Sequence, residues 1–242
     1  MLNRNRMVHS VVVMLSILLI SCYTQGNIGK GQEKESIGAM NNPIDYLALG
    51  DSYTIGEGVE ELERWPNQLS RRLSETGVHV AQTRIVAQTG WTTRDLLNAI
   101  ERTDLSDLSD DKLVSLLIGV NNQYQKLDIG SFKLEFDLLL NRSIQFAGNV
   151  DRVFVVSIPD YGVTPFGSSN AVQIGKELDE YNDYMSSKCA ALLVPFIDIT
   201  KTSRELSSSP NALASDNLHP SGFQYGKWLD QILPVVRALV LE

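Results

Sequence analysis

Apolar and polar residues alternate in blocks along the chain from about residue 44 onwards, and the blocks predict alternating strands and helices. Short apolar runs bounded by glycine or polar residues are typical of buried strands, whereas helices place apolar residues at every third or fourth position. The predicted strands are residues 46–49, a stretch within 78–87, 113–118, 153–158 and 194–199. The predicted helices are residues 65–75, a segment starting near Thr92, 131–146, 171–192 and 221–240.

Two of these helices carry recognisable end signals. Pro66 stands in the first turn of the helix 65–75 and Gly77 follows its end, which is the usual distribution of these two residue types. Thr92 and Asp95 have the spacing of a capping box, although aspartate is weaker than glutamate at the second position. The signals therefore favour helices that begin at these points.

Five strands, each followed by a helix, predict an α/β fold with right-handed crossovers, a five-stranded parallel sheet and helices on both faces, that is, a three-layer sandwich. The flavodoxin-like strand order 2-1-3-4-5 is the candidate topology. Ligands of such sheets bind beyond the carboxyl ends of the strands. Residues 43–242, about 200 in number, suit a single domain with a sizeable core.

The N-terminus has the layout of a secretory signal over residues 1–21. Arg4 and Arg6 precede an apolar run at 11–20, which is too short to span a bilayer. The run ends at a serine followed by Cys22, which resembles a bacterial lipobox, in which the cysteine is acylated and becomes the mature N-terminus. The alternative is an ordinary cleaved signal with a chance cysteine.

Residues 22–42 are rich in glycine, asparagine, glutamine and charged residues, and we interpret them as a flexible tether. Together with the signal, the tether predicts an extracytoplasmic protein of the bacterial cell envelope. The expected membrane contact is the lipid on Cys22 alone.

Charge and cysteine content narrow the range of partners. Removal of residues 1–21 takes away two arginines and no acidic residue, so the net charge of −8 becomes −10. This charge argues against nucleic acid or an anionic membrane surface as the main partner. If Cys22 is lipidated, Cys189 alone remains, so neither a disulfide framework nor a cysteine metal cluster is expected. Cys189 falls in a helical pattern and is interpreted as a small core residue.

Four polar segments follow predicted strands or lie in the last loop. They are Gly50-Asp51-Ser52-Tyr53, Gln88-Thr89-Gly90-Trp91, Gly119-Val120-Asn121-Asn122 and Asp216-Asn217-Leu218-His219. A serine hydroxyl at a strand end is a useful nucleophile only if a base is within hydrogen-bond reach and the resulting oxyanion is stabilised.

The base can be found by elimination among the three histidines. His9 lies in the signal, and His79 lies next to a strand, away from the carboxyl ends, which leaves His219. The ordinary histidine pKa of about 6.5 suits a general base at neutral pH. Asp216, three residues earlier, can reach the ring nitrogen that faces away from Ser52, fix the tautomer and stabilise the imidazolium.

The four segments together resemble the SGNH hydrolases, also called the GDSL esterase/lipase family, from about residue 44 to the C-terminus. The resemblance implies that Ser52 is the nucleophile and that Asp216 and His219 complete a catalytic triad. It also implies an oxyanion hole made by the Ser52 and Gly90 backbone N–H groups and the Asn121 side chain. A glycine at position 90 lets the backbone approach the substrate closely.

One departure from the family pattern concerns the third segment, which commonly ends in Asn-Asp but here ends in Asn121-Asn122. The oxyanion donor is kept, so the departure affects the hydrogen bonds around it. Each segment also has a plain structural alternative, since Gly-Asp-Ser and Asn-Asn are common in turns, a glycine such as Gly90 often ends a strand, and Asp-x-x-His can be a helix-entry hydrogen bond. Their joint occurrence in the family order favours catalysis.

The sequence is less informative about the residues that contact the substrate than about the catalytic residues. Tyr53, Trp91, Tyr124 and Tyr161, the last within the loop 159–166, follow strand ends and are predicted to line the pocket, although aromatic residues there are equally often the rim of a core. The absence of a long apolar insertion in the sequence favours a small, open esterase for short acyl groups, such as acetyl groups on carbohydrates. The carbohydrate expectation rests on the predicted location alone.

Two alternatives stay open at this point. The same residues could serve a lysophospholipase or a thioesterase-like acyl hydrolase, and the chain could be a non-catalytic surface lipoprotein that binds glycans. The sequence implies no metal and no cofactor.

Overall fold

The computed structural model of the chain describes residues 43–241. The predicted signal at 1–21, the lipidation site Cys22 and the tether at 22–42 lie outside the described residues, so these stay predictions. Among the helices of the described part, none is both long and apolar enough to cross a membrane.

A five-stranded sheet forms the centre of the described part, with the order β2-β1-β3-β4-β5 and every neighbouring pair parallel. This confirms the predicted α/β fold and its strand order. The strands are β1 (Ile44–Gly50), β2 (Val80–Ala87), β3 (Lys112–Leu117), β4 (Val153–Val156) and β5 (Phe196–Ile197).

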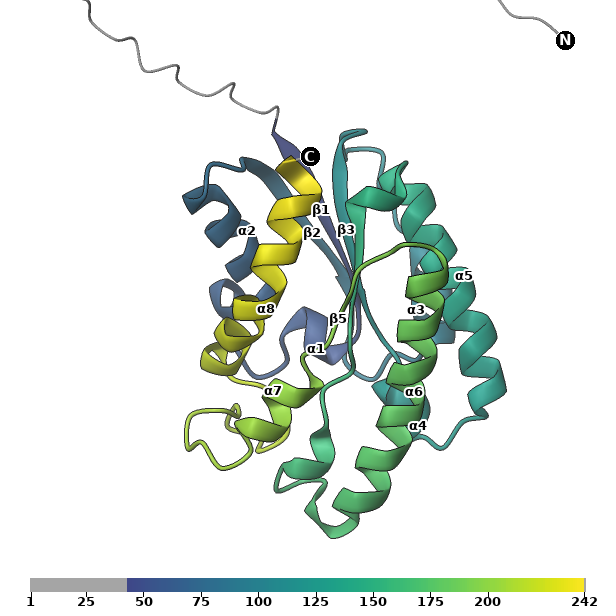
Figure 1. Cartoon of the computed structure of the whole chain (residues 1–242), viewed down its shortest axis with the longest axis vertical. Helices are drawn as coiled ribbons and strands as arrows, with labels where there is room; N and C mark the ends of the chain where they lie inside the picture. Colours follow the sequence, from purple (N-terminus) through teal and green to yellow (C-terminus); the bar gives the residue numbers. More distant parts are fainter. Residues whose placement is uncertain (1–42, 242) are drawn as a thin grey trace, which may run out of the picture. The chain divides into compact units, whose positions relative to one another are not determined.

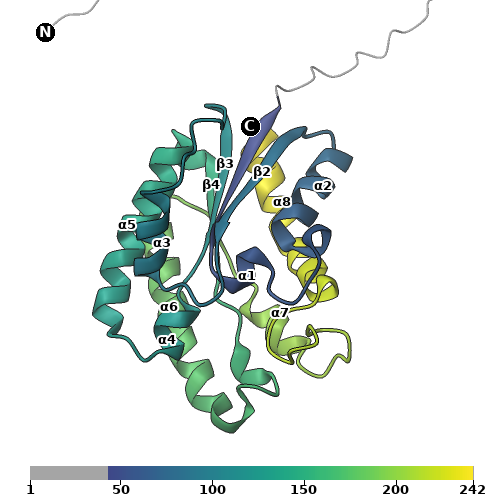
Figure 2. The same ribbon diagram turned by 180° about the vertical axis from the view of Figure 1, so that it is seen from behind.

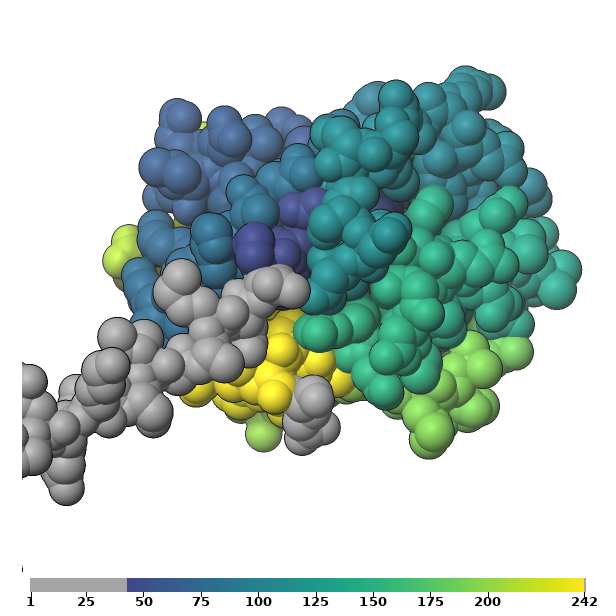
Figure 3. Space-filling view, turned by 90° about the horizontal axis from the view of Figure 1, so that it is seen from above, coloured from purple at the N-terminus to yellow at the C-terminus, as the bar shows by residue number. Residues whose placement is uncertain are grey.

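Helices cover both faces of the sheet, which confirms the three-layer arrangement. Helices α2 (Trp65–Glu75) and α8 (Gly222–Leu241) lie on one face, and α3 (Thr93–Ile100), α5 (Ile129–Ala147) and α6 (Ala171–Ala191) lie on the other (Figures 1 and 2). Figure 3 shows the end of the molecule where the strands begin, with the purple start of β1 and the yellow end of α8.

Short helices gather at the opposite end of the sheet, where the strands finish (Figure 1). They are α1 (Ser52–Ile55), α4 (Val120–Tyr124) and α7 (Thr200–Glu205), and 3₁₀ turns occur at Glu61–Glu63, Val150–Arg152, Tyr161–Val163 and Ser168–Asn170. The sequence pattern predicted none of these, because a helix of four to six residues is too short to show a 3.6-residue period.

Strand β1 is buried along its whole length because it lies between β2 and β3 with helices above and below. Its apolar side chains therefore pack into the core on both faces, as the continuous apolar run in the sequence indicates. Cys189 in α6 is also fully buried, and burial raises the pKa of its thiol to about 12, which fits the core role expected of it.

Strands β4 and β5 are shorter than predicted, and the hydrogen bonds explain why. At Ile158 the side chain of Asn182 takes over both backbone groups, accepting from the amide at 2.8 Å and donating to the carbonyl at 3.0 Å. Pro195 has no amide hydrogen to donate, although its carbonyl accepts from Val155 N. The ladder between the two strands is therefore limited to a few residues at the edge of the sheet.

The predicted end signals are confirmed. Helix α2 runs over the predicted residues 65–75 with Pro66 in its first turn. Thr92 and Asp95 form the capping box of α3, with the Thr92 amide donating to the Asp95 carboxylate at 2.9 Å.

Candidate functional site

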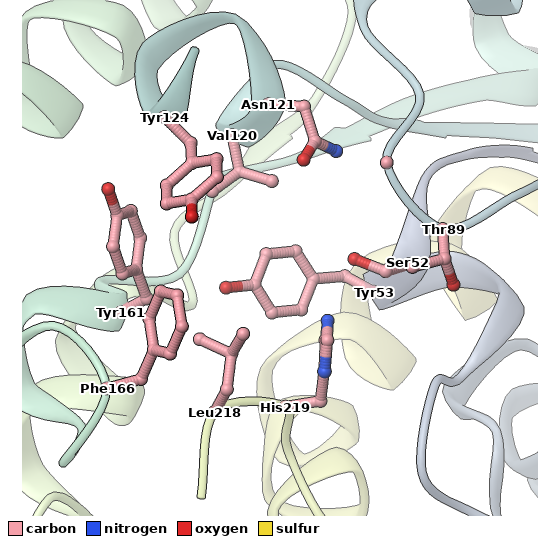
Figure 4. A pocket seen from close by; sticks show the side chains of 11 residues that line it. Ser52, Tyr53, Thr89, Val120, Asn121, Tyr124, Tyr161, Phe166, Leu218 and His219 are labelled. Atoms are coloured by element: carbon pink, nitrogen blue, oxygen red, sulfur yellow. The ribbon is translucent and has the colours of Figure 1, made fainter. Parts of the chain in front are cut away.

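A cavity of about 220 Å³ opens at the carboxyl ends of the strands (Figure 4). All four polar segments singled out in the sequence contribute to it. Its lining residues are Ser52, Tyr53, Thr89, Gly90, Val120, Asn121, Tyr124, Tyr161, Phe166, Leu218 and His219.

Ser52 stands at the start of α1, directly after β1. Gly50 permits this abrupt change of direction, because a Cβ on residue 50 would lie 2.1 Å from Thr54 Oγ1 and 2.5 Å from the Leu117 carbonyl oxygen. Asp51 caps the helix, since its Oδ1 accepts from Tyr53 N at 3.0 Å. Strand and cap therefore fix the serine at the edge of the cavity.

Asp51, the residue before Ser52, is fully buried, and its Oδ2 has no hydrogen-bond partner among the described residues. Burial raises the pKa of this carboxyl to about 7, although backbone N–H groups, that of Tyr53 among them, oppose the shift. The protonated form is thus favoured over a wide pH range.

His219 is fixed by Asp216 through two kinds of contact. The Asp216 Oδ2 lies 2.6 Å from His219 Nδ1, and Oδ1 accepts from the backbone amides of Leu218 and His219, each at 2.9 Å. Burial alone raises the pKa of Asp216, but the hydrogen bonds from His219 and Leu218 outweigh it and keep that pKa below its ordinary value. The carboxylate is therefore held ionised beside the inner ring nitrogen.

The loop that carries His219 is closed by backbone hydrogen bonds. Ala214 N donates to the His219 carbonyl at 2.8 Å, and Ser221 N donates to the Ala212 carbonyl at 2.9 Å. Ser221 then accepts from Gln224 N through its hydroxyl, at the start of α8. These hydrogen bonds therefore fix the position of the backbone at His219.

Ser52 and His219 meet at one end of the cavity. Figure 4 shows the Ser52 hydroxyl and the outer ring nitrogen of His219 facing the same space. The Tyr53 ring meets the imidazole edge-on, with ring centroids 5.7 Å apart, which restrains the ring on another side. His79, by contrast, is exposed at the amino end of β2.

Gly90 and Asn121, which follow the ends of β2 and β3, also line this cavity. Gly90 has a φ of +86°, and a Cβ there would meet nothing within 4 Å. This backbone conformation favours glycine, and the open space leaves the residue 90 amide accessible from the cavity, so the close approach to a substrate stays a prediction. Asn121 Nδ2 donates one hydrogen to the Trp91 carbonyl at 2.9 Å, and an amide nitrogen has a second hydrogen to donate.

Three of the four aromatic residues predicted to line the pocket do so, namely Tyr53, Tyr124 and Tyr161. Trp91 is not among the lining residues: its side chain is half-buried and packs against the core, while its carbonyl faces Asn121. Sequence reasoning did not single out Val120 and Leu218 as lining residues. Each directly precedes a proposed site residue in the sequence, and this position could have indicated that it lines the cavity.

Within residues 43–241, no three His, Cys, Asp or Glu side chains gather in a way that could hold a metal ion. The polar groups that converge in the cavity are a hydroxyl, an imidazole backed by a carboxylate, and N–H donors. This set can transfer a proton away from the hydroxyl and stabilise a negative oxygen.

The model of one protein family matches most of the chain. Residues 48–226 match the model of the GDSL-like lipase/acylhydrolase family. No curated protein matches the chain in sequence.

Among solved structures, the chain resembles the acetyl xylan esterase AlAXEase, with 19% identity, a TM-score of 0.63, and coverage of 80% of this chain and 100% of that one. An acetyl-xylooligosaccharide esterase from Geobacillus Stearmophilus matches with 18% identity, a TM-score of 0.60, and coverage of 80% and 94%. The esterase EstA from Pseudoalteromonas sp., inhibited by monoethylphosphonate, matches with 13% identity, a TM-score of 0.58, and coverage of 82% and 99%.

Proposed function

Because the chain belongs to the GDSL-like lipase/acylhydrolase family and is a hydrolase of carboxylic esters, we propose that it cleaves them with Ser52 as nucleophile, His219 as base and Asp216 as the orienting acid. The observation that carries the proposal is the shared cavity of Ser52 and His219, with Asp216 Oδ2 only 2.6 Å from the inner ring nitrogen. In that arrangement the outer nitrogen is free to take the serine proton.

The reaction runs in two steps. Ser52 Oγ attacks the ester carbonyl carbon while its proton passes to His219 Nε2, and the carbonyl oxygen becomes an oxyanion. The backbone N–H groups of Ser52 and Gly90 and the Asn121 amide donate to that oxyanion. Collapse breaks the ester bond, and His219 returns the proton to the departing alcohol. Water then attacks the acyl-serine by the same route, releasing the acid.

A short acyl group is the part of the substrate that this cavity favours. Its volume of about 220 Å³ is below the roughly 300–1,000 Å³ of pockets that enclose drug-sized ligands. Acetyl esters of carbohydrates are the proposed natural class, and the resemblance to an acetyl xylan esterase and an acetyl-xylooligosaccharide esterase supports this choice.

The acyl preference is tested by comparing kcat/KM for p-nitrophenyl acetate and p-nitrophenyl octanoate. The acetate should be the better substrate, because the cavity has little room for a long chain. Faster turnover of the octanoate would contradict the short-acyl proposal and favour a lysophospholipase or thioesterase-like activity.

The location of the protein forms a separate proposal. The lipobox-like sequence supports acylation at Cys22, which would attach the enzyme to the cell envelope outside the cytoplasm. The net charge of −10 without residues 1–21 argues against nucleic acid as the main partner. Labelling of the wild type but not of Cys22→Ser with a radioactive fatty acid in growing bacteria would support it. Equal labelling of the two would contradict it.

A further inference from the structure

A second cavity, of about 390 Å³, adjoins the first. The two share Tyr124, Tyr161 and Phe166 as lining residues. In Figure 4 these three rings stand together at the end of the first cavity that lies away from Ser52. A substrate held at Ser52 that extended past the rings would therefore reach the second cavity.

The three rings form one aromatic cluster, in which Tyr161 is buried and the other two rings are about half exposed. Their centroids are 6.0 to 6.3 Å apart, and Tyr124 and Phe166 are 54% and 50% exposed. Large apolar side chains that remain this exposed next to a reaction site are typical of a ligand-binding surface. Their flat faces suit the C–H face of a ring-shaped ligand.

Beyond the rings, the second cavity is lined by hydrogen-bonding side chains. Asn170 and Gln173 present amides at the start of α6, and Asn170 makes no side-chain capping bond there. Gln173 Nε2 and Gln123 Nε2 both donate to the Glu177 carboxylate, at 2.5 and 2.7 Å. Amides and a carboxylate are the groups that recognise multiple hydroxyl groups.

A hydrogen-bond chain ties this polar lining to the aromatic cluster. Tyr161 donates from its hydroxyl to Gln123 Oε1 at 2.9 Å, and the same glutamine donates to Glu177. Gln123 is buried, and its amide oxygen and its amide nitrogen both have hydrogen-bond partners inside the protein. Rings and polar groups are thus held in a fixed relation before any ligand arrives.

The charges in the cavity balance. Hydrogen bonds from Gln173 and Gln123 lower the pKa of Glu177, which is therefore ionised, and Lys126 lines the same cavity. One positive and one negative side chain give no preference for an anion or a cation. The lining therefore fits a neutral ligand with many hydroxyl groups.

We propose that the second cavity is a carbohydrate subsite, which binds a sugar unit of the alcohol part of the ester while the acyl group occupies the first cavity. The inference rests on the proposed function, since it assumes that the ester is cleaved at Ser52. It assigns a binding role to Asn170, Gln173 and Glu177 and a stacking role to Tyr124 and Phe166.

The kinetic test uses two acetyl esters, acetylated xylotriose and p-nitrophenyl acetate. For each variant, the ratio of the two kcat/KM values is measured, which cancels effects on the acyl step. Gln173→Ala should lower the ratio about fivefold, and the double variant with Asn170→Ala about tenfold or more, because each removes an amide that bonds to the sugar and neither side chain lines the first cavity. Gln145→Ala, an exposed glutamine on α5 outside both cavities, should leave the ratio unchanged.

A binding test does not depend on turnover. Xylotriose without acetyl groups should bind to Ser52→Ala, measured by isothermal titration calorimetry, and the two cavity substitutions should weaken that binding. Absence of any binding would overturn the subsite. A different result would be that xylotriose binds to Ser52→Ala but the wild type hydrolyses neither ester. That result would overturn the proposed function and still support a sugar-binding site in the second cavity.

A third arm separates sugar from acyl chain. An unchanged ratio in the cavity variants overturns the carbohydrate proposal. Faster hydrolysis of p-nitrophenyl octanoate by Gln173→Leu, together with that unchanged ratio, would indicate that the second cavity takes an acyl chain. Slower or unchanged octanoate hydrolysis in that variant, together with a lowered ratio, supports it.

Discussion

Asn122 and Thr93 exchange two hydrogen bonds across the ends of two neighbouring segments of the site. The Thr93 amide donates to Asn122 Oδ1 at 3.0 Å, and Asn122 Nδ2 donates to Thr93 Oγ1 at 2.7 Å. Thr93 Oγ1 in turn donates to the carboxylate of Glu135 on α5. The pair joins α3, which follows Gly90, to α4, which carries Asn121, so it holds the two proposed oxyanion donors together.

The direction of these bonds predicts that an aspartate is not tolerated at position 122. In Asn122→Asp the new carboxylate oxygen would face Thr93 Oγ1, whose only hydrogen is already donated to Glu135. We expect the free energy of unfolding to fall by about 1–3 kcal/mol, the usual cost of a buried polar contact without a partner. Urea denaturation measures this, with Asn141→Asp on the exposed side of α5 as the control.

A second substitution should reverse that loss. With Glu135→Gln added to Asn122→Asp, the new amide can donate to Thr93 Oγ1, and the threonine hydroxyl can donate to the new carboxylate. The double variant should then be more stable than Asn122→Asp alone. Simple additivity of the two single effects would show that the hydrogen-bond direction does not matter.

Asp51 predicts a specific pH dependence of stability. Because burial raises its pKa to about 7 in the folded state from 3.8, the folded protein holds a proton that the unfolded chain has lost between these values. Stability from this group therefore decreases as pH rises from about 4 to 7, by an upper limit of about 4 kcal/mol.

Asp51→Asn removes this titration and keeps an acceptor for Tyr53 N. The stability of the variant minus that of the wild type should rise between pH 4 and 7 and then level off. Asp128→Asn should show no such rise between pH 4 and 7, and a change of opposite sign only below about pH 4, since hydrogen bonds from Ser131 lower the pKa of Asp128 from 3.8. A difference for Asp51→Asn that is constant with pH would refute the account of this carboxyl.

Gly90 and Gly77 offer a matched pair of substitutions. Both have positive φ, +86° and +89°, and an added Cβ would meet nothing within 4 Å at either position. Gly90→Ala and Gly77→Ala should each lower stability by about 1–2 kcal/mol through backbone strain. Only Gly90→Ala should also lower kcat/KM, by about 10- to 100-fold, because alanine keeps the backbone N–H but the strain at this φ displaces that proposed oxyanion donor. Equal activity of the two variants would remove Gly90 from that role.

Asp216→Asn tests the orienting role of the carboxylate. The amide nitrogen that replaces Oδ2 would donate to His219 Nδ1 and force the proton onto the outer ring nitrogen, which could then no longer accept from Ser52. We expect kcat/KM for p-nitrophenyl acetate to drop by about 10³–10⁴ with measurable residual activity, since the oxyanion donors are kept. Asp230→Asn, on the exposed face of α8, is the control. Full activity of Asp216→Asn would contradict the orienting role.

The amino-acid sequence predicts the parts of this molecule that depend on local patterns. The Pro66 and Thr92 signals led to the correct helix starts, and the continuous apolar run led to strand β1, which begins two residues earlier than predicted. Burial and capping are decided within a few residues, so local patterns indicate them. The short edge strand β5 was predicted too long, because its end is decided by tertiary contacts. There the hydroxyl of Ser157 accepts from Ile199 N at 2.8 Å, far away in the sequence.

In the candidate site, too, the sequence predicts the features that depend on local motifs and misses those that depend on tertiary contacts. Ser52, Asp216 and His219 could be singled out because each belongs to a short motif at a predicted strand end or loop. The second cavity could not, since Gln173 and Glu177 look like the exposed face of a long helix until the fold brings Gln123 and Tyr161 against them. Trp91 was wrongly predicted to line the cavity, because its position after a strand does not determine the direction of its side chain.

The most direct test of the account is covalent labelling by a fluorophosphonate, in which the Ser52 oxygen forms a bond to phosphorus and fluoride leaves. Peptide mapping of the labelled wild type should find one adduct, on Ser52, and Ser52→Ala should take up no label while keeping the far-ultraviolet circular dichroism of the folded protein. Label that persists in Ser52→Ala, or a wild type that takes up none, would contradict Ser52 as the nucleophile.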